Sequence, residues 1–167
     1  EGGLRVLGSP VGTPTFCSSF IADALHAALA PAPLLPKLAD TPATFGMLLR
    51  CLHPRASYLA RTYAPTEDLL PHLRTFDVSI RDTFSSLLGP GSSLSSPWLH
   101  RQLTLPISQG GFGLVSIESI APLAFLGSWA AAFSLLADRF LVEDRPFLLS
   151  SLTEIEEGSL LFQVHLR

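Results

Sequence analysis

Apolar residues recur every three to four positions along most of the chain, which is the spacing of one face of an α-helix. The longest regular stripe consists of Leu69, Leu73, Phe76, Ile80, Phe84 and Leu87. Because Pro71 fits only the first turn of a helix, we expect regular helix to begin near Leu70. A second stripe follows Thr13-Pro14, a pair typical of a helix start because threonine caps the helix and proline fits its first position.

The remaining elements follow from similar start and stop signals. A helix is expected to begin at Thr41-Pro42, and His53-Pro54 is expected to end it or bend it sharply. Further helices are expected at residues 55–63, 97–103 and 117–140, and after Asp144 and Thr153. A short apolar run at residues 4–7, with glycines on both sides, predicts a strand, followed by a turn at residues 8–12. The sequence therefore predicts a mainly α fold of about seven helices with one short N-terminal strand.

Glycine, proline and serine divide the chain into regions. Gly89-Pro90-Gly91 stops the long helix, and residues 92–96 form a serine-rich link. We predict a strand and turn at residues 1–12, a helical region at residues 13–91 and a second helical region at residues 97–167. The chain begins with Glu1 rather than methionine, and we expect it to be a fragment of a longer protein.

Charged residues make up only 15% of the chain, below the average of about 25% for globular domains. This shortage indicates apolar surface that a partner, another part of the polypeptide or a membrane covers. Residues 119–137 carry no charge and approach the length of a membrane span. Pro122 and the absence of a neighbouring basic cluster favour a helix buried in a protein core instead, so we expect no membrane partner.

No catalytic or metal-binding motif is complete in this sequence. The two cysteines and five histidines lack the spacing of a zinc site, and Cys17 and Cys51 are expected to be buried in helices. Gly110, Gly111 and Gly113 lack the lysine of a phosphate-binding loop, so a turn with positive φ explains them better. We expect no metal ion and no chemistry carried wholly by this chain.

Arginines gather in the middle of the chain, where they are candidates for contact with a nucleic-acid backbone. The members of this group are Arg50, Arg55, Arg61, Arg74 and Arg81. Arg74 and Arg81 lie seven residues apart and share one helix face. Guanidinium groups suit phosphate oxygens and would read little base sequence. Asp77 and Asp82 partly neutralise this face, and Asp77 has the spacing of an ordinary helix ion pair with Arg81.

Three segments occur in a particular order along the chain. They are LRVLGSPVG at residues 4–12, MLLRCLHPRASYLARTYAPTEDLLPHLRTFD at residues 47–77 and LPISQGGFGLVSIESIAPLAFLGSWAAAF at residues 105–133. Their motif positions are Leu7, Gly8, Pro10, Gly12, Pro106, Gly110, Gly111 and Gly113. In order and spacing, these segments resemble the region that follows the catalytic palm in reverse transcriptases of non-LTR (LINE-like) retrotransposons.

The resemblance implies a thumb-like helical region that contacts template–primer duplex, with residues 1–12 leading out of a palm. The parent enzyme would be an RNA-directed DNA polymerase that uses Mg²⁺. The Phe/Tyr-x-Asp-Asp hairpin that carries its metal-binding carboxylates does not occur in this sequence, so we expect an inactive chain without a cofactor. The expected partners are an RNA–DNA or DNA duplex, bound weakly, and the remaining polymerase domains in cis. The resemblance also implies a nuclear or cytoplasmic location.

A helical protein-interaction scaffold that binds no nucleic acid is the alternative. The placement of the arginines distinguishes the two hypotheses. Arginines on one concave face favour nucleic acid, whereas scattered arginines paired with Glu67, Asp77 and Asp82 favour the scaffold.

Overall fold

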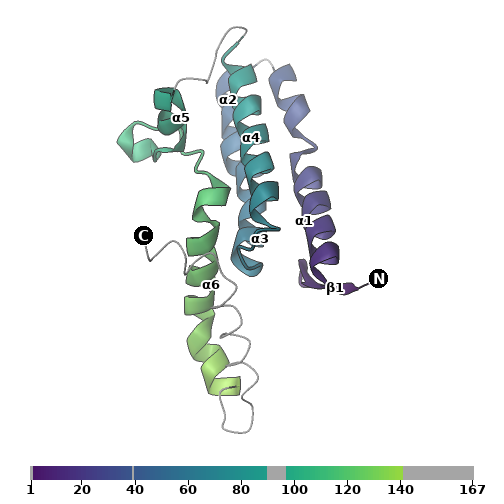
Figure 1. Ribbon diagram of the computed structural model, residues 1–167. Coiled ribbons are helices and arrows are strands. Elements are labelled where there is room, and N and C mark those ends of the chain that lie inside the picture. The colour runs from purple at the N-terminus through teal and green to yellow at the C-terminus, as the bar shows by residue number, and fades with distance from the viewer. Residues whose placement is uncertain (1, 39, 90–96, 141–167) are drawn as a thin grey trace.

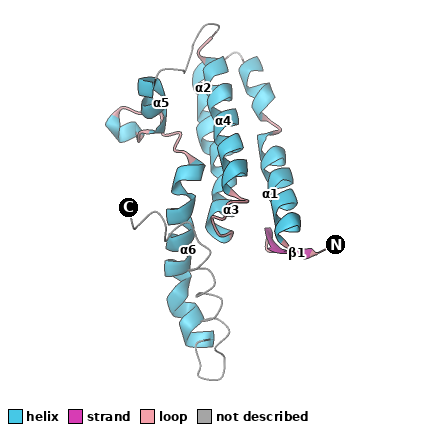
Figure 2. Ribbon diagram, in the orientation of Figure 1, coloured by secondary structure: helices cyan, strands magenta, loops and turns pink. Residues whose placement is uncertain are grey.

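The computed structural model describes residues 2–38, 40–89 and 97–140, and these residues are mainly helical (Figures 1 and 2). The strands are β1 (Gly3–Val6) and β2 (Ser9–Gly12). The α-helices are α1 (Pro14–Leu29), α2 (Thr41–Met47), α3 (Ser57–Thr62), α4 (Leu70–Leu87), α5 (Pro97–Thr104) and α6 (Ile117–Phe140). Shorter helical segments are η1 (Ala32–Lys37), η2 (Leu48–Leu52), η3 (His53–Ala56) and η4 (Ile107–Gln109).

The part of the chain that the structure describes contains fewer α-helices than the roughly seven expected for the whole sequence. The helices expected after Asp144 and Thr153 lie outside the described residues. The helix expected at residues 55–63 begins only at Ser57, because a π-helical turn (η2) and a 3₁₀ turn (η3) carry the chain through His53-Pro54. The proline changes the helical hydrogen bonding there without turning the chain into an extended segment.

The N-terminus forms an antiparallel hairpin instead of one strand and a long turn. Val6 pairs with Ser9 and Leu4 with Val11, so the turn contains only Leu7 and Gly8. These two residues have φ values of +49° and +89°, the combination of positive angles typical of a two-residue hairpin turn. The expectation of a turn across residues 8–12 was wrong because proline and glycine, which are uncommon in strands, occupy half of β2.

The starts of α1, α4, α5 and α6 agree with the sequence, and the start of α2 differs by one residue. The side chain of Thr13 accepts a hydrogen bond from the Phe16 amide at 3.4 Å, α4 begins at Leu70, and α6 extends from Ile117 to Phe140. In α2, however, the cap is Asp40, whose carboxylate accepts from the Ala43 amide at 2.9 Å. Thr41 is therefore the first helical residue and not the cap.

One hydrophobic core connects the two predicted helical regions. Its residues from the first region include Ile21, Leu48, Leu73, Phe76 and Ile80, and those from the second are Leu103, Leu114, Ile117 and Ala121. Figure 1 shows α4 between α1 and α6. Cys17 is buried as expected, whereas Cys51 is exposed because Leu48 and Leu52 take the buried positions of η2.

The glycine-rich segment after α5 is a turn, as the sequence predicts. Gly110 and Gly113 have φ values of +78° and +73°, which side-chain-bearing residues rarely adopt. The amides of Gly113 and Leu114 donate to the carbonyls of Leu105 and Leu103, each at 2.9 Å. The turn thereby returns the chain toward the core. Pro106 is the residue immediately before η4.

An aromatic cluster packs at the end of this turn. The ring of Phe112 lies 5.9 Å from Phe45 of α2 and 5.0 Å from Phe84 of α4, measured between ring centres. The Phe45 and Phe84 rings lie 5.7 Å apart. All three pairs meet at steep angles, an arrangement that aromatic rings favour. The cluster joins α2, α4 and the segment that leads into α6.

Among the described residues, one segment is long and apolar enough to cross a membrane by length and composition alone. This segment is Pro14–Lys37, whose most apolar 18 residues have a mean hydropathy of 1.2. It includes α1, whose Cys17, Ile21 and Leu25 are buried in the protein. The apolar stretch of α6, Ile117–Phe133, overlaps most of the uncharged run at residues 119–137 and is shorter than this segment.

Candidate nucleic-acid interface

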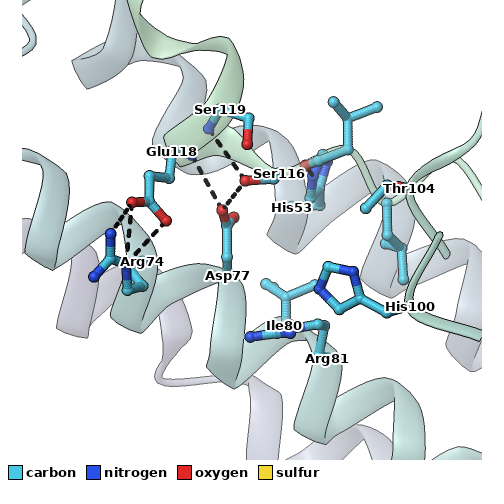
Figure 3. A pocket seen from close by; sticks show the side chains of 12 residues that line it. His53, Arg74, Asp77, Ile80, Arg81, His100, Thr104, Ser116, Glu118 and Ser119 are labelled. Carbon is cyan, nitrogen blue, oxygen red and sulfur yellow. Dashed lines mark hydrogen bonds and ion pairs between the residues drawn. The ribbon is translucent and has the colours of Figure 1, made fainter. Parts of the chain in front are cut away.

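A cavity of about 460 Å³ lies where α4, α5 and the start of α6 meet (Figure 3). Arg74 and Arg81 of α4 line it, together with His100 of α5 and Glu118 of α6. The prediction that Arg74 and Arg81 share one face is confirmed, since both side chains border the same hollow. We call this cavity the α4–α6 groove.

Asp77, on the same face of α4, caps the N-terminus of α6. Its carboxylate accepts hydrogen bonds from the Ser116 hydroxyl at 2.7 Å, the Ile117 amide at 3.0 Å and the Glu118 amide at 3.1 Å. These amides are the unpaired donors of a helix start, where a negative charge is also favourable. The expected ion pair between Asp77 and Arg81 was wrong, because the carboxylate turns toward α6 instead.

Arg74 forms a two-pronged ion pair with Glu118. Its Nη2 lies 2.6 Å and its Nε 3.0 Å from Glu118 Oε1. Hydrogen bonding to Glu118, followed by the attraction of its charge, raises the pKa of Arg74 above its usual value. The Arg74 side chain is still 70% exposed, against 24% for Glu118. Arg74 therefore offers donor surface to solvent, although its charge is largely balanced.

Arg81 is the unbalanced cation of the groove. The two carboxylates that line the groove, Asp77 and Glu118, each bond to other groups. Across the described ranges, no hydrogen bond or ion pair engages the half-buried Arg81 side chain. His53, at the back of the groove, donates through Nε2 to the Val115 carbonyl at 2.6 Å and so helps to hold the segment before α6.

The other three candidate arginines lie elsewhere. Arg55 donates to the Cys51 carbonyl at 3.0 Å and to the Ala28 carbonyl of α1 at 3.4 Å. Arg50 and Arg61 are exposed and do not line the groove. Arg55 bonds to α1 and Arg74 bonds to α6, and Figure 1 shows these two helices on opposite sides of α4. The structure brings two of the five arginines together.

Several contacts in and near the groove could not be predicted from the sequence. Asp77 and Ser116 are separated by 39 residues, and Arg74 and Glu118 by 44. Ser18 of α1 and His72 of α4 also share a hydrogen bond of 3.0 Å across 54 residues. The local signal available was Ser116 itself, whose hydroxyl accepts from the Ser119 amide at 3.1 Å in the manner of a helix cap.

Neither a metal-binding cluster nor a similarity to known proteins indicates a function for this groove. In the part of the chain that the structure describes, no three histidine, cysteine or acidic side chains gather where they could hold a metal ion. No family model, curated protein or solved structure matches the chain.

Proposed function

We propose that this chain is a non-catalytic, helical region of a retroelement RNA-directed DNA polymerase that contacts the backbone of template–primer duplex. The observation that carries the proposal is the α4–α6 groove, where Arg74 and Arg81 line one wall and both carboxylates are engaged by other groups. The Arg74 and Arg81 guanidinium groups lie beside carboxylates that already have hydrogen-bond partners, and guanidinium groups suit phosphate oxygens. The order of the three sequence segments described above supports the same proposal.

The spacing of the two arginines suits contacts with two phosphates of one strand, about three nucleotides apart. Seven residues of α-helix rise about 10 Å, which matches roughly three nucleotide steps of about 3.4 Å along one strand. Contacts of this kind fix the position of a duplex and carry little sequence information. The net charge of −3 opposes a polyanion, so we expect weak binding. Because the binding depends on phosphate contacts, we expect its affinity to fall steeply as the salt concentration rises.

Salt-dependent binding of a labelled RNA–DNA duplex tests the proposal. In fluorescence anisotropy at low salt, we expect binding by the full chain, with an affinity that falls as salt rises. Arg81→Ala should reduce the slope of log K against log salt by about 1, because one phosphate contact is lost. Arg81 is the preferred target, since Arg74→Ala would also leave Glu118 without its partner.

Lys37→Ala is the matched control, because it removes the same charge from η1 at an exposed position outside the groove. It should leave the salt slope unchanged. The proposal fails if the anisotropy does not change at the lowest salt concentration, or if Lys37→Ala and Arg81→Ala weaken binding equally.

A helical scaffold for another protein is the second candidate. Exposed apolar side chains along α6 favour it: Leu123 is 64% exposed, Leu126 46% and Phe133 47%. The engagement of Arg55 and Arg74 within the chain favours it as well. Under this alternative, duplex does not bind and Arg81→Ala leaves protein partners unaffected.

A further inference from the structure

The face of the N-terminal hairpin that points away from α1 is apolar. Leu4 is 72% exposed, Val6 47% and Val11 57%. Leu4 is paired with Val11 and lies two residues from Val6, so all three side chains project from the same face. On the opposite face, Pro10 is buried and the Arg5 guanidinium lies 5.8 Å from the centre of the Phe20 ring on α1.

The two outer edges of the hairpin differ in hydrogen-bonding capacity. Because the turn has two residues, Val6 and Ser9 are hydrogen-bonded to each other, and so are Leu4 and Val11. The next hydrogen-bonded pair is Gly2 and Thr13, since the Thr13 amide donates to the Gly2 carbonyl at 2.8 Å. Gly3 and Arg5 in β1 therefore direct both N–H and C=O groups outward.

The edge of β2 is blocked at the equivalent positions. Opposite Arg5 lies Pro10, which has no N–H group. Opposite Gly3 lies Gly12, whose carbonyl accepts from the Cys17 thiol at 3.7 Å. Proline on an edge strand is a common protection against pairing. β1 has no such protection, and no described residue bonds to the outward backbone groups of Gly3 or Arg5.

Contacts with two helices hold β1 in its extended conformation. The Tyr58 hydroxyl of α3 donates to the Leu7 carbonyl at the turn. Gly3 packs so closely against the Phe16 ring of α1 that a side chain at this position would collide with it. A strand held in this way loses little conformational entropy when it pairs, which favours binding.

We propose that β1 binds an extended segment of another protein, and not of a second copy of this chain, along its outer edge by β-strand addition. Outward N–H and C=O groups at every second residue match the backbone of another strand, which supplies the same groups with the same period. The exposed Leu4 and Val6 side chains call for apolar residues at alternate positions of that segment. The partner strand needs about four residues, since β1 itself spans only Gly3–Val6.

Amide hydrogen exchange on the full chain tests this proposal with a defined probe. The probe is an acetylated and amidated heptapeptide of alternating threonine and valine residues. At saturating peptide, we expect exchange of the Arg5 and Gly3 amides to slow by roughly tenfold, because both become hydrogen-bonded donors. The Gly12 amide should not change, since it lies on the blocked edge.

Two variants separate the edge from the rest of the surface. Leu4→Lys places a charge on the exposed apolar face and should weaken peptide binding roughly tenfold, whereas Leu34→Lys, at a 58% exposed site on η1, should not. Arg5→Pro removes one outward donor and should abolish protection. If circular dichroism shows that Arg5→Pro does not fold, the comparison of Leu4→Lys with Leu34→Lys decides.

Unchanged exchange at Arg5 in saturating peptide overturns the proposal. Protection of Arg5 that grows with the concentration of the chain alone, without peptide, identifies a second copy as the occupant and overturns the assignment of the partner.

Discussion

At the scale of single residues, Tyr63 is the side chain whose ionisation the fold alters most clearly. Burial raises its pKa from 10.0 to about 12, and a hydrogen bond with Cys17 contributes in the same direction. Burial acts in this way because the charged phenolate loses solvation that the neutral hydroxyl does not need. The fold therefore favours the protonated form of this tyrosine.

Absorbance titration of phenolate can measure this pKa directly. The chain has two tyrosines, so Tyr58→Phe leaves Tyr63 as the single titrating phenol. We expect a midpoint of about 12 in the folded chain. A midpoint near 10, the value of an exposed tyrosine, would contradict the burial seen in the structure.

The same shift predicts how alkaline pH affects stability. Because the pKa of Tyr63 is higher in the folded chain, its contribution to stability is fully present below the unfolded value of 10.0 and is lost as pH rises through about 12. The urea midpoint should therefore fall less between pH 9 and pH 11 in Tyr63→Phe than in the unmodified chain.

At the scale of the elements, local chemistry explains what the sequence predicts correctly. Thr13-Pro14 and the stripe from Leu69 to Leu87 act through neighbours within a few residues, and α1 and α4 begin where these signals place them. The cap of α2 was misplaced by one residue, since Asp40 and Thr41 are both suitable caps. The hairpin was missed because Leu7 adopts a positive φ that leucine rarely takes.

The groove was less predictable than the helices that form it. Helical periodicity indicates that Arg74 and Arg81 share a face, but it cannot indicate what packs against that face. Asp77 illustrates the limit. Within α4 it lies three residues from Arg74 and four from Arg81, whereas in the folded chain the start of α6 supplies three donors to it.

Removing the cap supplied by Asp77 should destabilise α6 and the chain with it. We expect Asp77→Ala to lower the free energy of unfolding by about 2 kcal/mol, because the Ile117 and Glu118 amides and the Ser116 hydroxyl lose their acceptor. Urea unfolding followed by circular dichroism measures the change. Asp82→Ala is the control, since Asp82 is an exposed aspartate on the same helix and should cost less than about 0.5 kcal/mol. Equal losses in both variants would show that Asp77 does not stabilise α6.

At the scale of the whole molecule, the described residues behave as one packed unit in spite of the serine-rich link. Leu103, Leu114, Ile117 and Ala121 share a core cluster with residues of α1, α3 and α4. The boundary predicted from composition at residues 92–96 therefore separates elements along the chain and does not separate two cores. Glycine and serine indicate where the backbone turns, but they carry no information about which apolar faces meet afterwards.

The aromatic cluster allows a test of whether the two helical regions unfold as one unit. Phe84 of α4 is 3% exposed and contacts Phe112, which precedes α6. We expect Phe84→Ala to lower the free energy of unfolding by about 3–4 kcal/mol, through lost burial and the cavity left behind. Both tryptophans, Trp98 and Trp129, lie in α5 and α6, so their fluorescence reports on the second region while circular dichroism reports on all helices.

If α4 and α6 unfold together, the two signals should give the same urea midpoint in the unmodified chain and shift equally in Phe84→Ala. Phe133→Ala provides the matched control, because this phenylalanine is 47% exposed and its loss should change stability by less than about 0.5 kcal/mol. A tryptophan transition that stays in place while the circular dichroism transition shifts would mean that the second region unfolds by itself. The Arg74–Glu118 pair and the Asp77 cap would then not suffice to couple the two walls of the groove.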